Sequence, residues 1–229
     1  MKTQAIVVAA GKGLRLKSKT SKALVEISRI PIIILTLKAI SQSNLLSSII
    51  VVCRRQDIAR INKLVSKFKI AKIKRIVAGG KERHDSVRLG LEAMDRDTDF
   101  VLIHDGARPF VDKEIIDSSI KKAFRYKASV AAVSVKPTIK KIKFMNGEVF
   151  ARETLKRDSL REIQTPQVFK RELIENAYKN FKFGFPTDDA SLIEKTKNKV
   201  AICPGSYFNI KITTPEDLVF AEAILKTKG

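Results

Sequence analysis

Short, continuous runs of apolar residues alternate along the chain with longer stretches in which apolar residues recur every three or four positions. Continuous runs are typical of strands buried on both faces, and the spaced pattern is typical of helices with one buried face. Strands are predicted at residues 6–8, 48–53, 73–78, 100–104, 129–135, 200–203 and 210–212. Helices are predicted at residues 31–41, 58–68, 115–124 and 173–181, from Asp85 or Ser86 to Met94, from Thr187 onward, and from Thr214–Pro215 to Leu225.

This alternation predicts an α/β fold with a mainly parallel, Rossmann-like sheet and helices on both faces. Ligands of such sheets bind at the carboxyl ends of the strands. Three stretches rich in glycine, alanine, arginine or aspartate follow predicted strands, at Ala9–Gly13, Gly79–Arg83 and Asp105–Pro109. We expect the three stretches to meet at one edge of the sheet and to form a single site.

The alternation is interrupted between residues 138 and 160. The dipeptide Asn146–Gly147, the strongest two-residue hairpin signal, separates two short strand-like segments at 139–144 and 148–152. An isolated hairpin is marginally stable in water, so this segment needs a partner surface. We interpret residues 1–229 as one domain, with residues 138–160 as a protruding arm that pairs with a second copy of the chain.

The 229 residues are 44% hydrophobic and 30% charged, which is ordinary for a globular protein. No apolar run approaches the ~20 residues of a membrane span, and the first strand begins too close to Met1 for a signal peptide. Cys53 and Cys203 both lie in apolar runs; a disulfide is one reading, and two buried thiols in a cytoplasmic protein are the favoured one. We expect a cytoplasmic protein without a membrane anchor.

The formal net charge of +21 is the one unusual bulk property. It suggests a nucleic-acid partner, but the lysines are scattered, few aromatic residues lie among them, and no nucleic-acid-binding motif accompanies them. We favour a lysine-rich surface, whose field would still attract anionic substrates. Nucleic acid is therefore an unlikely partner.

The first glycine-rich stretch suits a phosphate-binding loop. Glycines at positions 11 and 13 let backbone N–H groups approach an anion, and Arg15 and Lys22 add positive charge. Leu16 stands where a dinucleotide fingerprint needs a third glycine, and a Walker ending is absent. A plain strand-to-helix turn is the alternative reading.

A single carboxylate, Asp105, follows the strand at 100–104, where it suits Mg²⁺ bound together with substrate phosphates; a turn or capping aspartate is the alternative. Arg108, beside Pro109, would present a fixed guanidinium to a phosphate. His104 is expected to be a packing residue at a strand end. Two distant histidines without cysteine pairs argue against zinc, and the pattern shows no covalent nucleophile.

With these stretches in view, the chain resembles the 2-C-methyl-D-erythritol 4-phosphate cytidylyltransferases of the non-mevalonate isoprenoid pathway, over nearly its whole length. The matching pieces are AAGKGLR at 9–15 with Lys22 beyond it, GGKERHDSV at 79–87, HDGARPF at 104–110, VKPTIK around Thr138, QTPQVF at 164–169, TDDAS at 187–191 and FNIKITTPEDL at 208–218. The first piece is shared by many sugar nucleotidyltransferases, and the ordered set is far more specific.

The resemblance implies a Mg²⁺-dependent transfer of a cytidylyl group from CTP to 2-C-methyl-D-erythritol 4-phosphate. It implies nucleotide binding by Ala9, Ala10, Gly11, Gly13, Arg15, Lys22, Gly80, Ser86 and Gly106, metal binding by Asp105, and substrate binding by Arg108, Thr138, Arg157, Thr165, Thr187 and Lys211. Arg15, Lys22 and Lys211 would carry catalysis. Thr138 and Arg157 would reach the site of the partner in a homodimer.

Three positions depart from the family pattern: Ser21 replaces a proline, Lys81 a frequent acidic residue, and Phe208 a common aspartate that would orient Lys211. The close alternative is a ribitol-5-phosphate cytidylyltransferase, in which Ser-Val-Arg-Pro is more usual than the Gly-Ala-Arg-Pro of residues 106–109. A sugar-1-phosphate nucleotidyltransferase that uses UTP or GTP and a non-enzymatic basic binding module are more distant alternatives.

Overall fold

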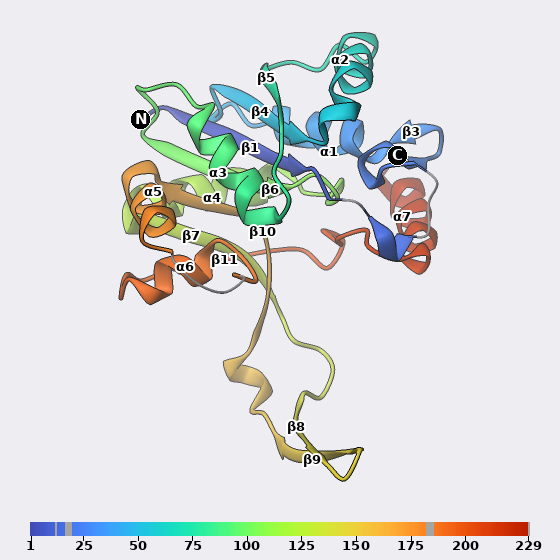
Figure 1. The fold of residues 1–229 in the computed structure, drawn as a ribbon, viewed down its shortest axis with the longest axis vertical. Helices are drawn as coiled ribbons and strands as arrows, with labels where there is room; N and C mark the ends of the chain where they lie inside the picture. The colour runs from blue at the N-terminus through green and yellow to red at the C-terminus, as the bar shows by residue number, and fades with distance from the viewer. Residues whose placement is uncertain (12, 17–19, 182–185, 229) are drawn as a thin grey trace.

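The computed structural model describes residues 1–11, 13–16, 20–181 and 186–228. Its centre is a seven-stranded sheet with the order β11-β7-β10-β6-β1-β4-β5 (Figure 1). The strands are β1 (Thr3–Ala9), β4 (Ser48–Cys53), β5 (Ile73–Ala78), β6 (Phe100–Asp105), β7 (Ala128–Ser134), β10 (Arg161–Lys170) and β11 (Ala201–Pro204). The predicted α/β class with a mostly parallel sheet is confirmed.

The central strands are buried on both faces. Ile6 of β1 pairs with Ile50 of β4 on one side and with Ile103 of β6 on the other, and all three side chains are fully buried. Continuous apolar sequence is what such positions require, because each face of the sheet is covered by helices.

Helices cover the two faces in separate groups (Figure 1). One apolar core joins the sheet to α1 (Ile32–Ser41), α2 (Ile58–Lys67) and α4 (Lys113–Tyr126). The other core joins it to α3 (Arg83–Glu92), α5 (Arg171–Asn180) and α6 (Ala190–Lys195). A smaller third cluster packs α7 (Pro215–Lys228) against the two-stranded ribbon of β2 (Glu26–Ile27) and β3 (Ile30–Pro31).

Four local predictions are corrected by the structure. Strand β10 was not predicted, and it runs antiparallel between β6 and β7. Residues 210–212 form no strand; the buried Ile212 packs against α7 instead. Helix α3 begins at Arg83, with Glu82 and Asp85 forming a capping box, and α6 begins at Ala190 rather than at Thr187.

The predicted hairpin arm is present. Strands β8 (Lys140–Met145) and β9 (Glu148–Thr154) pair antiparallel around Asn146 and Gly147, whose φ angles of 51° and 80° are those that this turn requires. Every residue of both strands is exposed. Figure 1 shows the hairpin far from the sheet, at the end of two extended segments, and the second of these segments continues into β10.

Cys53 and Cys203 are buried free thiols, which agrees with the favoured reading. Among the described residues, no helix is both long and apolar enough to cross a lipid bilayer.

Candidate active site

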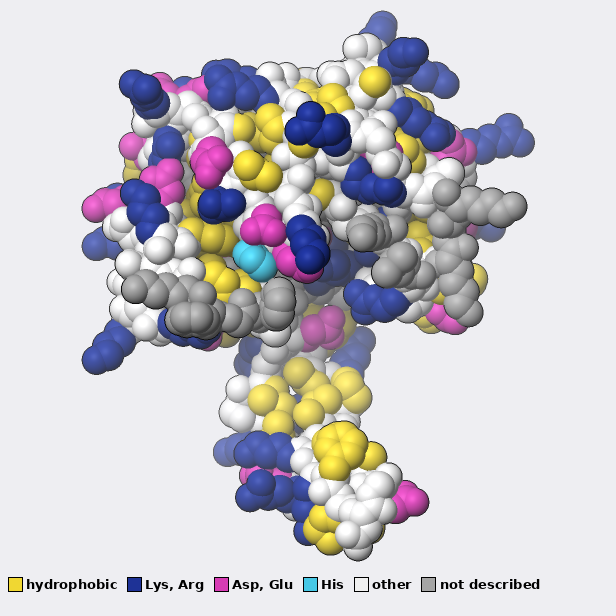
Figure 2. Space-filling model, in the orientation of Figure 1, with side chains coloured by type: hydrophobic (Ala, Val, Ile, Leu, Met, Phe, Trp, Pro, Cys, Tyr) yellow, Lys and Arg dark blue, Asp and Glu magenta, His cyan; other side chains and the backbone are white. Residues whose placement is uncertain are grey.

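A cavity of about 830 Å³ opens at the carboxyl ends of β1, β4, β5 and β6. It is bordered by Val8, Ala10, Gly11, Gly13, Arg15, Lys22, Arg54, Arg55, Gln56, Gly79, Gly80, Lys81, Glu82, Arg83, Ser86, Asp105, Ala107, Lys211 and Thr213. Seven of these side chains are cationic and two are acidic. Figure 2 shows Lys and Arg side chains gathered around this hollow above the arm. Such a cavity favours a strongly anionic ligand.

The three glycine- and arginine-bearing stretches therefore meet, as the sequence predicts. Gly13 has a φ of 68°, and a Cβ placed on it would lie 2.6 Å from the Cβ of Lys22. Glycine is required there because a side chain would be strained and would push Lys22 away. Ser86 fastens the second stretch, since its Oγ accepts a bond from Gly80 N (3.2 Å) and donates to Glu82 O (3.1 Å).

Lys22 is held in an environment that disfavours its charge. Burial, together with the neighbouring cations Lys211 and Arg15, lowers its pKa to about 8 against the attraction of Asp105. A lysine in this condition gains most from an anion that enters the cavity, because the anion replaces repulsion with attraction.

Asp105 lies at the centre of three cations. Its Oδ2 is 2.8 Å from Lys211 Nζ and 3.6 Å from Arg108 Nε, and its Oδ1 is 3.3 Å from Arg83 Nε. Burial alone would raise the pKa of Asp105, but the three cations outweigh it and hold that pKa well below its usual range. The carboxylate is therefore ionised at any physiological pH.

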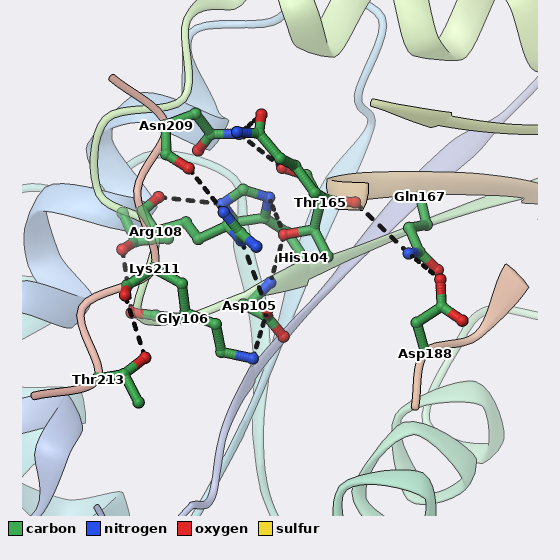
Figure 3. A network of polar contacts seen from close by, with 12 residues as sticks. His104, Asp105, Gly106, Arg108, Thr165, Gln167, Asp188, Asn209, Lys211 and Thr213 are labelled. Atoms are coloured by element: carbon green, nitrogen blue, oxygen red, sulfur yellow. Dashed lines mark hydrogen bonds and ion pairs between the residues drawn. The ribbon is translucent and has the colours of Figure 1, made fainter. Parts of the chain in front are cut away.

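A buried layer of hydrogen bonds fixes Asp105 from behind (Figure 3). The backbone N–H of Asp105 donates a hydrogen bond to Thr165 Oγ1 (3.1 Å). The Thr165 hydroxyl in turn donates its own hydrogen to His104 Nδ1 (3.1 Å). His104 Nε2 then carries its own proton and donates it to Arg108 O (3.1 Å). Burial lowers the pKa of His104 to about 4, so the ring is neutral, and it packs at the strand end as expected.

The segment that presents Lys211 is held by the same layer. Arg108 Nη1 donates to Asn209 O (2.7 Å), and Asn209 Nδ2 donates to Thr165 O (2.9 Å). Lys211 follows Asn209 by two residues and is thereby directed towards Asp105 (Figure 3). Arg108 and Thr165 thus adjoin Asp105 without bordering the nucleotide-sized cavity itself.

Several expected residues lie elsewhere. Ala9 and Gly106 are buried behind the cavity wall, where Gly106 N donates to Val8 O (2.8 Å). Thr187 is exposed, next to Asp188, which accepts a bond from Gln167 Nε2 (2.8 Å). Thr138 and Arg157 are exposed on the arm and do not border the cavity of their own chain.

Arg83 ends the stretch Gly79–Arg83 that was expected at the site, but sequence reasoning assigned it no role of its own. It bridges Asp105 to Asp189, whose Oδ2 lies 2.8 Å from Arg83 Nη2. Both partners are distant in sequence, by 22 and 106 residues, so no local pattern identifies the contacts. The fold brings them together by placing the start of α3 between β6 and the start of α6.

Comparison with known proteins identifies the family. A family model of 2-C-methyl-D-erythritol 4-phosphate cytidylyltransferase (IspD) matches residues 3–227. The chain belongs to this IspD family.

Relatives agree along the whole chain. An IspD of Halalkalibacterium halodurans is 43% identical over 230 residues, covering 100% of this chain and 99% of the relative. The IspD of Alkaliphilus oremlandii is 44% identical over 230 residues, covering 99% of this chain and 96% of the relative. The crystal structure of 4-diphosphocytidyl-2C-methyl-D-erythritol synthase from Anaerococcus prevotii is similar with a TM-score of 0.87 and 34% identity, covering 98% of this chain and 96% of that one.

The three departures from the IspD pattern have distinct surroundings. Ser21 is buried beside Lys22, and its Oγ has no hydrogen-bond partner within the part of the chain that the structure describes. Lys81 is exposed at the cavity rim, and Phe208 is 54% exposed. Phe208 was expected to leave Lys211 without one orienting partner. In the structure the carboxylate of Asp105 contacts the ammonium group of Lys211 directly.

The IspD resemblance implies a bound Mg²⁺ ion, and Asp105 is the residue expected to hold it. Among the described residues, no cluster of three or more His, Cys, Asp or Glu side chains suits a metal ion. Asp105 supplies one carboxylate at the cavity wall, and its Oδ1 has a single long contact with Arg83. This donor set fits Mg²⁺, which binds through one or two carboxylates together with substrate phosphates.

Proposed function

We propose that this IspD transfers the cytidylyl group of CTP to 2-C-methyl-D-erythritol 4-phosphate, with Mg²⁺, to give 4-diphosphocytidyl-2-C-methyl-D-erythritol and pyrophosphate. The proposal rests on family membership and on one observation: the cavity brings seven cationic side chains to the carboxyl edge of the sheet. Both reactants are anions, so a site for them must above all offset their mutual repulsion.

The reaction needs alignment more than acid, base or nucleophile. The oxygen of the sugar phosphate attacks the α-phosphorus of CTP in line with the departing pyrophosphate. Arg15 and Lys22 would bind the triphosphate, and Lys211 with Arg108 would bind the sugar phosphate. Lys211 is held by Asp105 and Arg108 by the carbonyl of Asn209 before the substrates arrive, so these two cations would stabilise the developing charge with little reorganisation.

The backbone of the first two loops would hold the nucleoside. Ala10, Gly11 and Gly80 border the cavity with little side-chain bulk, and Ala9 and Gly106 are buried outside the cavity lining. Ser86 Oγ retains one free lone pair after its two bonds to the loop, so it is proposed to contact the base or ribose.

Asp105 would hold the metal ion. When bound, Mg²⁺ would neutralise charge on the phosphates of CTP. Thr165 and His104 keep the backbone of Asp105 in place, as described above, and Lys211 neutralises the carboxylate while the metal is not bound.

The arm would complete the site of a second subunit. We propose one domain over residues 1–229, in which the arm at 138–160 forms a homodimer. Phe144 and Val149 are 74% and 55% exposed on the arm, which is costly for a monomer in water. Thr138, Arg157 and Thr187 would then line the sugar-phosphate pocket, the first two from the partner.

The enzyme is proposed to work in the cytoplasm without nucleic acid. The unpaired thiols of Cys53 and Cys203 suit a reducing compartment, and the cations that border the cavity belong to a substrate-sized hollow rather than to an extended groove.

The test is pyrophosphate release from CTP and Mg²⁺ with each acceptor. We expect rapid release with 2-C-methyl-D-erythritol 4-phosphate and slow release with ribitol 5-phosphate, and slow release when UTP, GTP or ATP replaces CTP. Faster release with ribitol 5-phosphate would overturn the choice of acceptor, and no release with either would overturn the proposal.

A further inference from the structure

A buried polar chain leads away from the nucleotide cavity into the layer of α5 and α6. Tyr178 of α5 donates its hydroxyl to Asp189 Oδ1 at 2.5 Å, and Arg83 donates to Asp189 Oδ2 at 2.8 Å. The Asp189 side chain is fully buried. Of these three residues, Arg83 alone borders the cavity.

We propose that Asp189 and Tyr178 are positioning residues of the nucleotide site, which hold the guanidinium of Arg83 at a fixed distance from Asp105. The inference rests on the proposed role of Asp105 as a metal ligand. Neither Asp189 nor Tyr178 touches the cavity, so both act through Arg83.

The strength of the two contacts of Arg83 supports this role. Its bond to Asp189 is shorter than its contact with Asp105, at 2.8 Å against 3.3 Å. An uncompensated charge in the interior is strongly destabilising, so the fully buried Asp189 cannot release Arg83. Burial would lower the pKa of Arg83, but Asp189 and Asp105 raise it, so the guanidinium is always charged.

The geometry has a consequence for Asp105. An unrestrained arginine pairs with a carboxylate through two parallel hydrogen bonds. Arg83 instead presents its Nε alone, because its Nη2 is taken by Asp189. Asp105 Oδ1 thereby keeps lone-pair capacity for a metal ion that arrives with the nucleotide. Without Asp189, Arg83 would close on Asp105 and compete with the metal.

The experiment measures Mn²⁺ binding by electron paramagnetic resonance in the presence of CTP and without a sugar-phosphate acceptor, so that no turnover occurs. Asp189→Asn is expected to weaken CTP-dependent Mn²⁺ binding about 10- to 100-fold, the scale of losing a partner of a metal ligand. Tyr178→Phe, which keeps every charge, is expected to weaken it in the same direction by a smaller factor.

A double-mutant cycle separates positioning from general damage. If Asp189 acts through Arg83, Asp189→Asn has no further effect on Mn²⁺ affinity in an Arg83→Gln background. The matched control is Asp117→Asn, because Asp117 also accepts two short bonds, from Lys113 and Ser43, and lies outside the cavity lining. It should lower the melting temperature and leave Mn²⁺ binding unchanged.

Additive effects in the cycle, or an equal loss in Asp117→Asn, would overturn the positioning role. If Arg83→Gln does not fold, unchanged Mn²⁺ binding in a folded Tyr178→Phe variant would also overturn the positioning role. Absence of CTP-dependent Mn²⁺ binding in the wild-type enzyme would instead refute the metal role of Asp105, and the positioning role would fall with it.

Discussion

At the scale of single residues, Lys22 carries the clearest electrostatic signature. Its pKa of about 8 arises from burial and from the nearby Lys211 and Arg15. Phosphates bound beside it would favour its charged form and raise that pKa, so binding of CTP takes up a proton near pH 8. Affinity must then fall as pH rises through that value, because the charge that attracts the triphosphate is lost.

We therefore predict that CTP binds progressively more weakly from pH 7.5 to 9.5, a range in which phosphate groups stay ionised because their second pKa is about 6. Calorimetry in buffers of different ionisation enthalpy would measure both the affinity and the proton uptake. Lys22→Arg, which stays charged, should flatten the profile. A wild-type affinity that does not change with pH would contradict the assignment.

The same shift predicts an effect on stability. Because the pKa of Lys22 is lower in the folded than in the unfolded protein, the unfolded state binds more protons between about pH 8 and 10.5, and stability rises with pH across that window. Lys22→Met should raise the melting temperature of the nucleotide-free enzyme by about 2–4 °C, as measured by calorimetry. A lower melting temperature would show that Lys22 stabilises the free protein.

The position of Lys211 leads to a prediction about the turnover rate. Its ammonium group is held 2.8 Å from Asp105 and is proposed to meet the sugar phosphate. Lys211→Ala should lower the turnover rate by at least ~10²-fold, as expected for loss of a fixed electrostatic partner, and Lys22→Ala should do likewise. Rapid-quench kinetics with saturating substrates would check this. A folded variant with normal turnover would remove that lysine from catalysis.

Sequence reasoning found the residues whose chemistry is visible in a local motif. Arg15 and Lys22 lie in the segment after β1 and Asp105 ends β6, and the sequence predicts that they share one edge, where the structure brings them together. Arg83 was missed because a single arginine after Gly79–Gly80 looks like any exposed cation. Its role depends on Asp189, and a contact between residues so far apart exists only in the folded chain.

At the scale of elements, a close contact at Gly90 holds α3 against β1 and β4 of the sheet. A Cβ on Gly90 of α3 would lie 2.6 Å from Ile6 Cγ2 and 3.2 Å from Val52 Cγ2. An alanine in a free helix would add about 1 kcal/mol of stability. Overpacking costs about 1–3 kcal/mol in a close-packed core, so the contact outweighs the helix preference.

Gly90→Ala is therefore predicted to lower the melting temperature and to raise the KM for CTP, because α3 carries Arg83 and Ser86 to the cavity. Thermal denaturation and steady-state kinetics would test both. Ser66→Ala, in an exposed position of α2, is the control and should not destabilise. A rise in melting temperature for Gly90→Ala would contradict the packing argument.

The arm can be tested by mixing two inactive variants. If Arg157 serves the site of the partner, Arg157→Ala and Lys22→Ala subunits form heterodimers in which one of two sites has both residues. Random exchange at equal concentrations should then restore about a quarter of the wild-type sites, since C₂ dimers pair statistically. The rate of pyrophosphate release would report this. A mixture that stays inactive would place Arg157 in its own chain's site.

Helices and strands could be predicted where their burial in the core produces a clear pattern of apolar residues in the sequence. The bounds of the strands at Ser48–Cys53 and Ile73–Ala78 match the prediction. The first is a fully buried, mainly apolar run, and the second is an edge strand whose end is marked by Gly79 and Gly80. Strand β10 was missed because its buried centre is polar: Gln164 and Gln167 are satisfied by Asn209 and Asp188 rather than by apolar packing. Residues 210–212 have the composition of a strand, but none of the strands that the structure describes pairs with them.

At the scale of the whole molecule, the net charge of +21 acts at a distance. Arg54, Arg55 and Lys81 border the cavity but have no proposed contact with substrate. Their position favours a role in attracting CTP towards the cavity, since a cleft lined by charges of one sign raises the rate of encounter with an oppositely charged ligand.

We predict that kcat/KM for CTP falls about tenfold between low and high ionic strength, with little change in kcat. Arg54→Ala/Arg55→Ala should reduce this salt dependence. The control Lys121→Ala/Lys122→Ala removes the same charge from α4, outside the cavity lining, and should leave the dependence nearly intact. Equal slopes for the two double variants would show that only net charge matters.

Strand β10 also limits how the arm can vary among descendants of this chain. The strand continues directly from the arm and ends in the core beside β6, with Thr165 bonded to Asp105 on the way. Side chains alternate between faces in a regular strand, and β10 already has one irregularity between Ile163 and Gln167. A one-residue insertion between Thr154 and Thr165, without a further compensating bulge, would therefore turn that hydroxyl to the wrong side. Length changes are therefore tolerated at the hairpin tip and come in pairs at its base.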